Sequence, residues 1–104
     1  MDIVYASLKR RHPGTGAEAS EAAEAVDALW AHAKPADGLQ HASAQPALDR
    51  IDLLLYLLSR DPSDLPDAVG RAHSLVSRSH RTSPLLRRCY LPPEPPGATG
   101  HTAR

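Results

Sequence analysis

The sequence lacks several residue types. Its 104 residues include one cysteine, one tryptophan, three tyrosines and no phenylalanine or asparagine. A single cysteine, Cys89, excludes a disulfide within the chain and favours a reducing compartment, so we expect a cytoplasmic protein. The absence of Asn and Phe, with an excess of Ala and Arg, is typical of GC-rich coding sequence. The abundance of Ala and Arg is therefore weak evidence about function.

The chain also lacks a membrane-spanning run and a secretory signal. The longest apolar stretch lies within residues 48–60, which as a helix would span about 20 Å, short of a hydrocarbon core of about 30 Å. Asp2 precedes the first apolar residues and the basic cluster follows them, the reverse of a signal peptide. The length fits one small domain, which we expect at 1–91, followed by a loosely packed Pro- and Gly-rich tail at 92–104.

Apolar periodicity and breaker residues predict an all-α fold, a bundle of three main helices at about 16–33, 47–60 and 65–81. Thr15 and Glu18 form a capping-box pattern before the first helix, and Ser63 or Asp64 can cap the third. Residues 2–11 suit a short helix, although Ile3 and Val4 also suit a strand. Residues 34–46 are interpreted as a loop because they contain two prolines and a glycine. Residues 85–91 add one helical turn or an extended arm.

The leucine-rich segment 47–60 indicates association. On a helical wheel its apolar arc covers about 220°, more than one neighbouring helix can bury. Leu53 and Leu57 fall on the side turned away from Ile51, Leu55 and Leu58. Together with Leu54 they form a candidate partner interface. Exposed apolar patches of this size are unusual on a soluble monomer, and a two-fold dimer is the commonest way to cover one.

Charge is unevenly distributed although the net charge is zero. Ten acids lie between Glu18 and Asp67, whereas the residues from Ala68 onward contain six arginines and one acid, Glu94. The candidate surface for an anionic partner consists of Arg71, Ser74, Arg78, Arg81, Arg87 and Arg88. It is either a basic face that complements an acidic helix of the same fold or a contact surface for nucleic acid. The joint at residues 61–66 has about the length of a helix-turn-helix turn, but the helix predicted before it is unusually apolar.

Candidate catalytic and metal-binding groups do not form a recognisable pattern. His73 and His80 are seven residues apart, about 10.5 Å along a helix, too far to bind one zinc ion. Cys89 follows two arginines, which favour a thiolate, but no sequence pattern supplies a base. Asp49 and Asp52 are explained by the solubility of an otherwise apolar segment.

The sequence therefore predicts a non-enzymatic helical association module without a cofactor or metal, either a homodimer or an accessory or regulatory subunit of another protein. The alternative is a small DNA-binding transcriptional regulator that uses the basic third helix. No membrane partner or small-molecule substrate is inferred.

Overall fold

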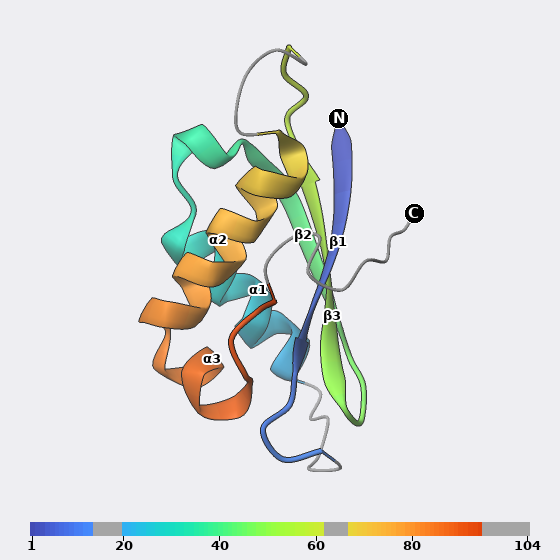
Figure 1. Cartoon of the computed structure of the whole chain (residues 1–104), viewed down its shortest axis with the longest axis vertical. Helices are drawn as coiled ribbons and strands as arrows, with labels where there is room; N and C mark the ends of the chain where they lie inside the picture. Colours follow the sequence, from blue (N-terminus) through green and yellow to red (C-terminus); the bar gives the residue numbers. More distant parts are fainter. Residues whose placement is uncertain (14–19, 62–66, 95–104) are drawn as a thin grey trace.

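The computed structural model describes residues 1–13, 20–61 and 67–94, which form a sheet with helices on one of its faces (Figure 1). In chain order the elements are β1 (Asp2–Lys9), α1 (Glu21–His32), the 3-10 helix η1 (Pro35–Asp37), β2 (Leu39–Pro46), β3 (Arg50–Leu57), α2 (Ala68–Thr82) and α3 (Pro84–Cys89). Of the predicted tail at 92–104, the described part ends at Glu94.

The sheet has three strands in the order β1-β3-β2. Central β3 is antiparallel to both neighbours, and its partners run from Asp2↔Leu57 to Lys9↔Arg50 on one side. On the other side β2 pairs from Leu39↔Leu57 to Pro46↔Ile51, with one irregularity between Leu39 and His41. β1 and β2 are therefore parallel to each other with β3 between them, the arrangement of a split β-α-β unit.

The prediction of an all-α helical bundle is wrong, because the fold is mixed α/β. The leucine-rich segment predicted as a helix at 47–60 contains β3, in which Ile51, Leu53, Leu55 and Leu57 are buried and the residues between them are half-exposed. This alternation has the period of two of a strand. A short apolar run fits a helix as well as a strand, and here neighbouring strands supply the backbone partners.

Two further segments differ from their predicted structure. Residues 2–9 form β1 rather than a short helix, and their side chains alternate between the two faces of the sheet. The predicted loop at 34–46 contains η1 and β2. In β2 small residues such as Ala42 and Ala44 face the helices, and polar residues such as His41 and Ser43 face outward, so its alternation carried little hydrophobic contrast.

The other two predicted helices exist with shifted boundaries. The helix predicted at 16–33 is α1, and that predicted at 65–81 is α2. The cap of α2 is Asp67, whose carboxylate accepts a hydrogen bond from Gly70 N at 2.8 Å. The predicted caps Thr15, Glu18, Ser63 and Asp64 lie outside the described residues. The final apolar segment forms α3, and Tyr90 after it pairs with the end of β1, so it supplies both a helical turn and an extended arm.

The core lies between the helices and one face of the sheet. Its fully buried members come from β1, α1, β3, α2, α3 and the residue after α3, and include Leu8, Leu29, Ile51, Leu55, Leu75, Val76, Leu86 and Tyr90. α1 packs over β2 and α2 over β1, so both long helices lie on the same side of the sheet, and no other described element covers its opposite side (Figure 1). No helix of the described residues is long and apolar enough to cross a membrane.

Candidate association surface

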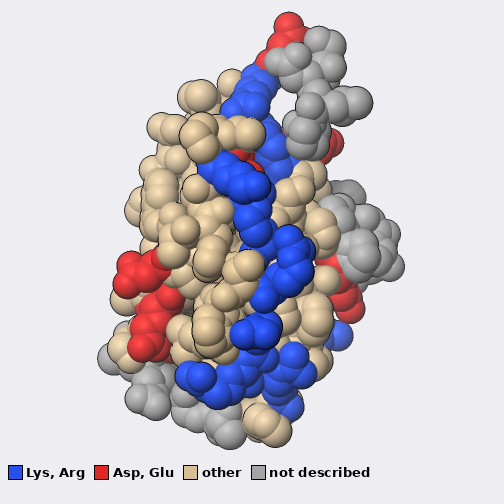
Figure 2. Space-filling model, turned by 90° about the vertical axis from the view of Figure 1, so that its left-hand side faces the viewer, with Lys and Arg blue, Asp and Glu red and all other residues tan. Residues whose placement is uncertain are grey.

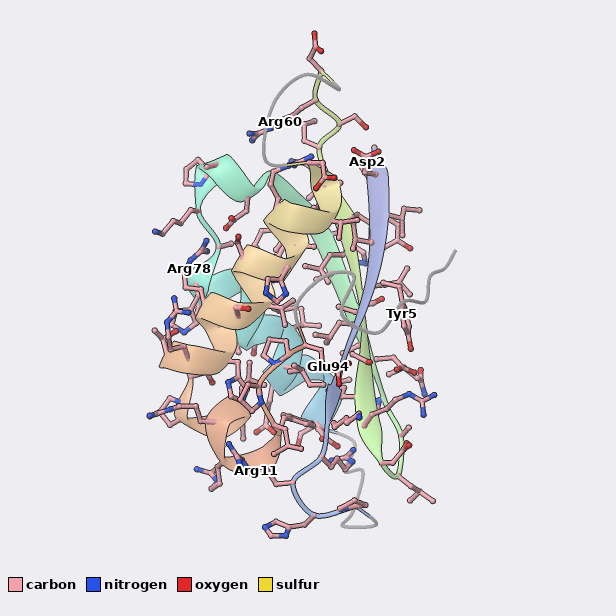
Figure 3. All side chains as sticks on the ribbon, viewed as in Figure 1. Asp2, Tyr5, Arg11, Arg60, Arg78 and Glu94 are labelled. Atoms are coloured by element: carbon pink, nitrogen blue, oxygen red, sulfur yellow. The ribbon has the colours of Figure 1, made fainter. Side chains whose placement is uncertain are left out.

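The face of the sheet opposite the helices exposes an apolar and aromatic cluster, which we call the open face: Ile3 and Tyr5 of β1 with Leu54 and Tyr56 of β3. The register places Ile3 opposite Tyr56 and Tyr5 opposite Leu54, so the four side chains are neighbours. Ile3 and Tyr5 are each 60% exposed. Figure 3 shows the labelled Tyr5 side chain pointing away from the helices. No described helix or loop covers this cluster.

Polar contacts hold the open face in place. The Tyr5 hydroxyl donates to Asp52 Oδ1 at 2.6 Å, and Arg50 Nε donates to the same oxygen at 2.8 Å. The hydrogen bond to Asp52 raises the pKa of Tyr5, so the phenol stays neutral and keeps donating. On the other side of β3 the His41 ring lies edge-on to the Tyr56 ring, with 5.2 Å between centroids. The charges at Arg50 and Asp52 offset each other, and the open face is close to neutral.

Among the described residues, the outer edge of β1 is paired at its C-terminal end alone. Arg10 and Tyr90 form an antiparallel bridge, in which Arg11 N donates to Cys89 O at 3.0 Å and Leu91 N donates to Lys9 O at 2.8 Å. The backbone groups of Lys9 therefore point outward. Because alternate residues of a strand direct their N–H and C=O groups to the same side, those of Ile3, Tyr5 and Ser7 also point outward.

Proline residues follow the Arg10–Tyr90 bridge directly and prevent it from continuing as a fourth strand. After Leu91, the next residue that would donate to β1 is Pro93, opposite Ser7, and proline has no N–H. Pro92, Pro93, Pro95 and Pro96 make the sequence that follows a poor strand former. Within the described residues, no strand pairs with the outer edge of β1 from Ile3 to Ser7. We call this segment the free edge.

The three leucines predicted to form a partner interface do not lie on one exposed surface. Leu53 and Leu57 point toward the helices and are 2% and 0% exposed, so neither is available to a partner. Only Leu54 lies on the open face, where it is half-buried. Ile3 and Tyr5 were missed because β1 was interpreted as helical. The β-branched and aromatic run at the start of "DIVYASLK" was the signal that could have identified them.

The candidate anionic-partner surface divides into structural and exposed residues. Arg71 is buried and donates from Nη1 to the carbonyl oxygens of Asp37 and Leu58, both at 3.1 Å. Arg78 forms an ion pair with buried Asp37 at 2.9 Å and donates to His32 O at 2.8 Å. These two arginines attach α2 to η1 and α1. Ser74, Arg81, Arg87 and Arg88 remain exposed.

The exposed side chains of Arg81, Arg87 and Arg88 form, together with Arg11, a surface that we call the basic band. Figure 2 shows Lys and Arg side chains in an almost continuous line along the side of the molecule that carries α2. Arg11 lies beside α3, because its Nε donates to Arg87 O at 2.7 Å. Burial, and then the charges of Arg11 and Arg87, lower the pKa of His80, which indicates positive potential at this end of the band. α2 and α3 contain no acidic residue.

The first helix that a helix-turn-helix motif would need is not a helix in the structure. The element directly before residues 61–66 is the strand β3, whereas that motif requires a helix on each side of its turn. The basic band is the remaining feature that favours an anionic partner.

A cavity of about 500 Å³ lies between the end of β1, the start of α1 and α3. In its wall Arg10 donates two hydrogen bonds to Glu21, at 2.6 and 2.9 Å, and the Tyr90 hydroxyl also donates to Glu21. Glu21 is thus occupied by structural partners. Cys89 also lines the cavity and is half-buried, but among the described residues its thiol makes no hydrogen bond to a base.

The two histidines considered as metal ligands, His73 and His80, contact different partners. His73 contacts the Ser77 hydroxyl at 3.2 Å, whereas His80 contacts the Tyr90 carbonyl at 2.9 Å. The described part of the chain contains no group of three or more His, Cys, Asp or Glu side chains that could hold a metal ion.

No protein-family model matches the chain, and no curated protein or solved structure is similar enough to match it.

Proposed function

We propose that the protein is a non-enzymatic association module, acting in the cytoplasm, that forms a homodimer through the uncovered side of its sheet. The observation that carries this proposal is the exposure of β1 in two directions. Ile3 and Tyr5 are exposed on the open face, and the backbone of the same strand has a free edge. Exposed apolar side chains and unpaired edge strands both favour association.

Three properties support self-association. The open face is nearly neutral, which suits contact with an identical surface better than contact with a strongly charged partner. Domains of this size bury a modest core and are often completed by a second subunit. The free edge lacks the lysine, proline or bulge with which monomeric proteins commonly protect an edge strand.

The test replaces Ile3 and Tyr5 together by Lys and measures the mass in solution by sedimentation over a range of concentrations. We expect the wild type to form dimers and the double variant to remain a folded monomer, because four lysines would meet near the two-fold axis. The matched control replaces Leu48 and Val69 by Lys. These residues are 70% and 50% exposed and lie outside the open face and the free edge. Their replacement by Lys adds the same charge as the double substitution in β1. A wild-type protein that stays monomeric at high concentration would contradict the proposal.

The basic band supports a second candidate function, binding to the phosphate groups of nucleic acid. Arg11, Arg81 and Arg87 are exposed, and no ion pair is found for them among the described residues. Basic side chains arranged in a line are suited to a phosphate backbone.

This candidate is tested by titrating labelled duplex DNA at several salt concentrations. If the three arginines contact phosphates, the variant with Gln at all three positions should bind more weakly and show a salt dependence reduced by about 0.9 for each lost contact. Arg50→Gln, on the opposite side of the sheet, serves as the control. Equal binding by the wild type and the triple variant would remove the band as a nucleic-acid surface.

A further inference from the structure

The free edge has a defined length and centre. Lys9 already accepts a hydrogen bond from Leu91, so pairing with another strand can extend from the start of β1 only as far as Ser7. The outward-pointing backbone groups in this window are those of Ile3, Tyr5 and Ser7, and Tyr5 is the middle residue. A two-fold axis at Tyr5 would map the window onto itself.

We propose that two copies of the chain pair through their β1 strands, antiparallel, with Tyr5 opposite Tyr5 of the second copy and Ile3 opposite its Ser7. This inference rests on the proposed self-association and specifies its geometry. The paired strands would join the two sheets into one, in the strand order β2-β3-β1-β1-β3-β2. In an antiparallel pair the residues of a hydrogen-bonded pair exchange both N–H···O bonds. This register therefore satisfies every free backbone group from Ile3 to Ser7.

The side chains suit this register on both faces. On the face toward the helices it places Val4 opposite Ala6 of the second copy, a larger residue opposite a smaller one. Both are only partly buried in the single chain and pack against its core, so the pairing would cover them further. On the open face it places the two Tyr5 rings side by side and extends the apolar cluster across both copies.

A second copy suits the free edge better than the chain's own C-terminal sequence. Pro92, Pro93, Pro95 and Pro96 remove the N–H donors that a fourth strand would need directly after Leu91. An identical β1 has all its donors and acceptors in the required alternation. The described chain ends its own pairing at Leu91, so the two kinds of pairing would occupy successive parts of the same edge.

Cysteine cross-linking tests the register. In a Cys89→Ser background, Tyr5→Cys should form a disulfide-linked dimer on mild oxidation, because cross-strand partners have Cα atoms about 5.5 Å apart. Ile3→Cys is the matched control: Ile3 is exposed to the same extent as Tyr5 but would lie about 14 Å from its own copy along the strands. We expect rapid cross-linking of the first variant and little of the second. Preferential cross-linking through Ile3, or equal cross-linking of both, would overturn this register.

A backbone substitution separates strand pairing from contact between open faces. Tyr5→Pro removes the tyrosine side chain together with an outward-pointing N–H, whereas Tyr5→Ala removes the side chain alone and keeps that donor. We expect the proline variant to lose the dimer and the alanine variant to retain more of it, with circular dichroism confirming that both are folded. If the proline variant fails to fold, the cross-linking result alone decides.

The outcomes distinguish this inference from the proposed function. A dimer that persists with Tyr5→Pro would overturn strand pairing and leave self-association through the open face intact. A monomeric wild type would overturn both. A monomer that dimerises only after deletion of residues 95–104 would instead identify the chain's own C-terminal sequence as the occupant of the edge.

Discussion

At the scale of single residues, Asp37 attaches η1 to α2. Its carboxylate accepts hydrogen bonds from Lys34 N at 2.7 Å and from Arg78 at 2.9 Å, while the Asp37 carbonyl accepts one from Arg71. Burial by itself would raise the pKa of Asp37, but the hydrogen bonds from Arg78 and from the Lys34 backbone outweigh it and lower the pKa. The charged form of Asp37 is therefore part of the folded state.

Replacing Asp37 by Asn should lower the free energy of unfolding by about 3 kcal/mol, because it leaves a largely buried Arg78 without its counter-charge. The folded-state pKa lies below the unfolded value of about 3.9, so the stabilisation is complete above that pH and is lost as the pH falls through the folded pKa. Urea unfolding at pH 7 and through the acid range measures both effects. An Asn variant as stable as the wild type at pH 7 would contradict the role of the ion pair.

His80 is stabilised in its neutral form. Its Nε2 lies 2.9 Å from the Tyr90 carbonyl oxygen, which can only accept, so Nε2 carries the proton and donates. Burial lowers the pKa of His80, and the charges of Arg11 and Arg87 lower it further. Protonation therefore opposes folding.

Since the folded-state pKa of His80 lies below the unfolded value of about 6.5, the free energy of unfolding should fall as the pH drops below that value. His80→Gln keeps an N–H donor but cannot titrate, so its unfolding should vary less with pH between about 5 and 7. His73→Gln, on the same helix, is the control and should retain the wild-type dependence. An identical pH dependence in the His80 variant and the wild type would rule out this role.

At the scale of elements, β3 organises the core. It is the central strand, and its residues alternate between the helix layer and the open face. As a helix, the same segment would place Leu54 and Leu55 on the same packed side. As a strand, it places Leu55 in the core and Leu54 on the open face.

Replacing Leu55 by Ala should lower the free energy of unfolding by about 2–5 kcal/mol, the usual range for a truncated core leucine. Leu54→Ala should cost much less, because the side chain is half-exposed before truncation. Thermal or urea unfolding of the two variants measures the difference. Similar losses from both would favour a helical packing of this segment.

At the scale of the whole molecule, dimer formation and stability should be linked. A partner that binds only the folded chain stabilises it by mass action, so the melting temperature of the wild type should rise by a few degrees when the protein concentration is raised a hundredfold. The variant with Lys at positions 3 and 5 should melt at a temperature that does not depend on concentration. Differential scanning fluorimetry and calorimetry together cover the required range. A concentration-independent melting temperature of the wild type would count against a homodimer.

Local sequence determined the two long helices. Their apolar spacing repeats every three to four residues, and proline and glycine residues separate them from their neighbours, so α1 and α2 were found near their predicted positions. The uneven charge was also visible, because the residues after Ala68 contain almost no acid. These properties depend on residues close together in the chain.

The tertiary structure decided the state of the leucine run and the availability of the arginines. A short run of leucines satisfies a helix and a central strand equally well, and only hydrogen bonding to β1 and β2, distant in sequence, selects the strand. Arg71, Arg78 and Arg81 share one helix, yet η1 packs over the first two and leaves the third exposed. The open face and the free edge likewise exist only once three separate segments form one sheet. The packing of the helices determines which face of the sheet is buried, and the strand order determines which strand lies at the edge.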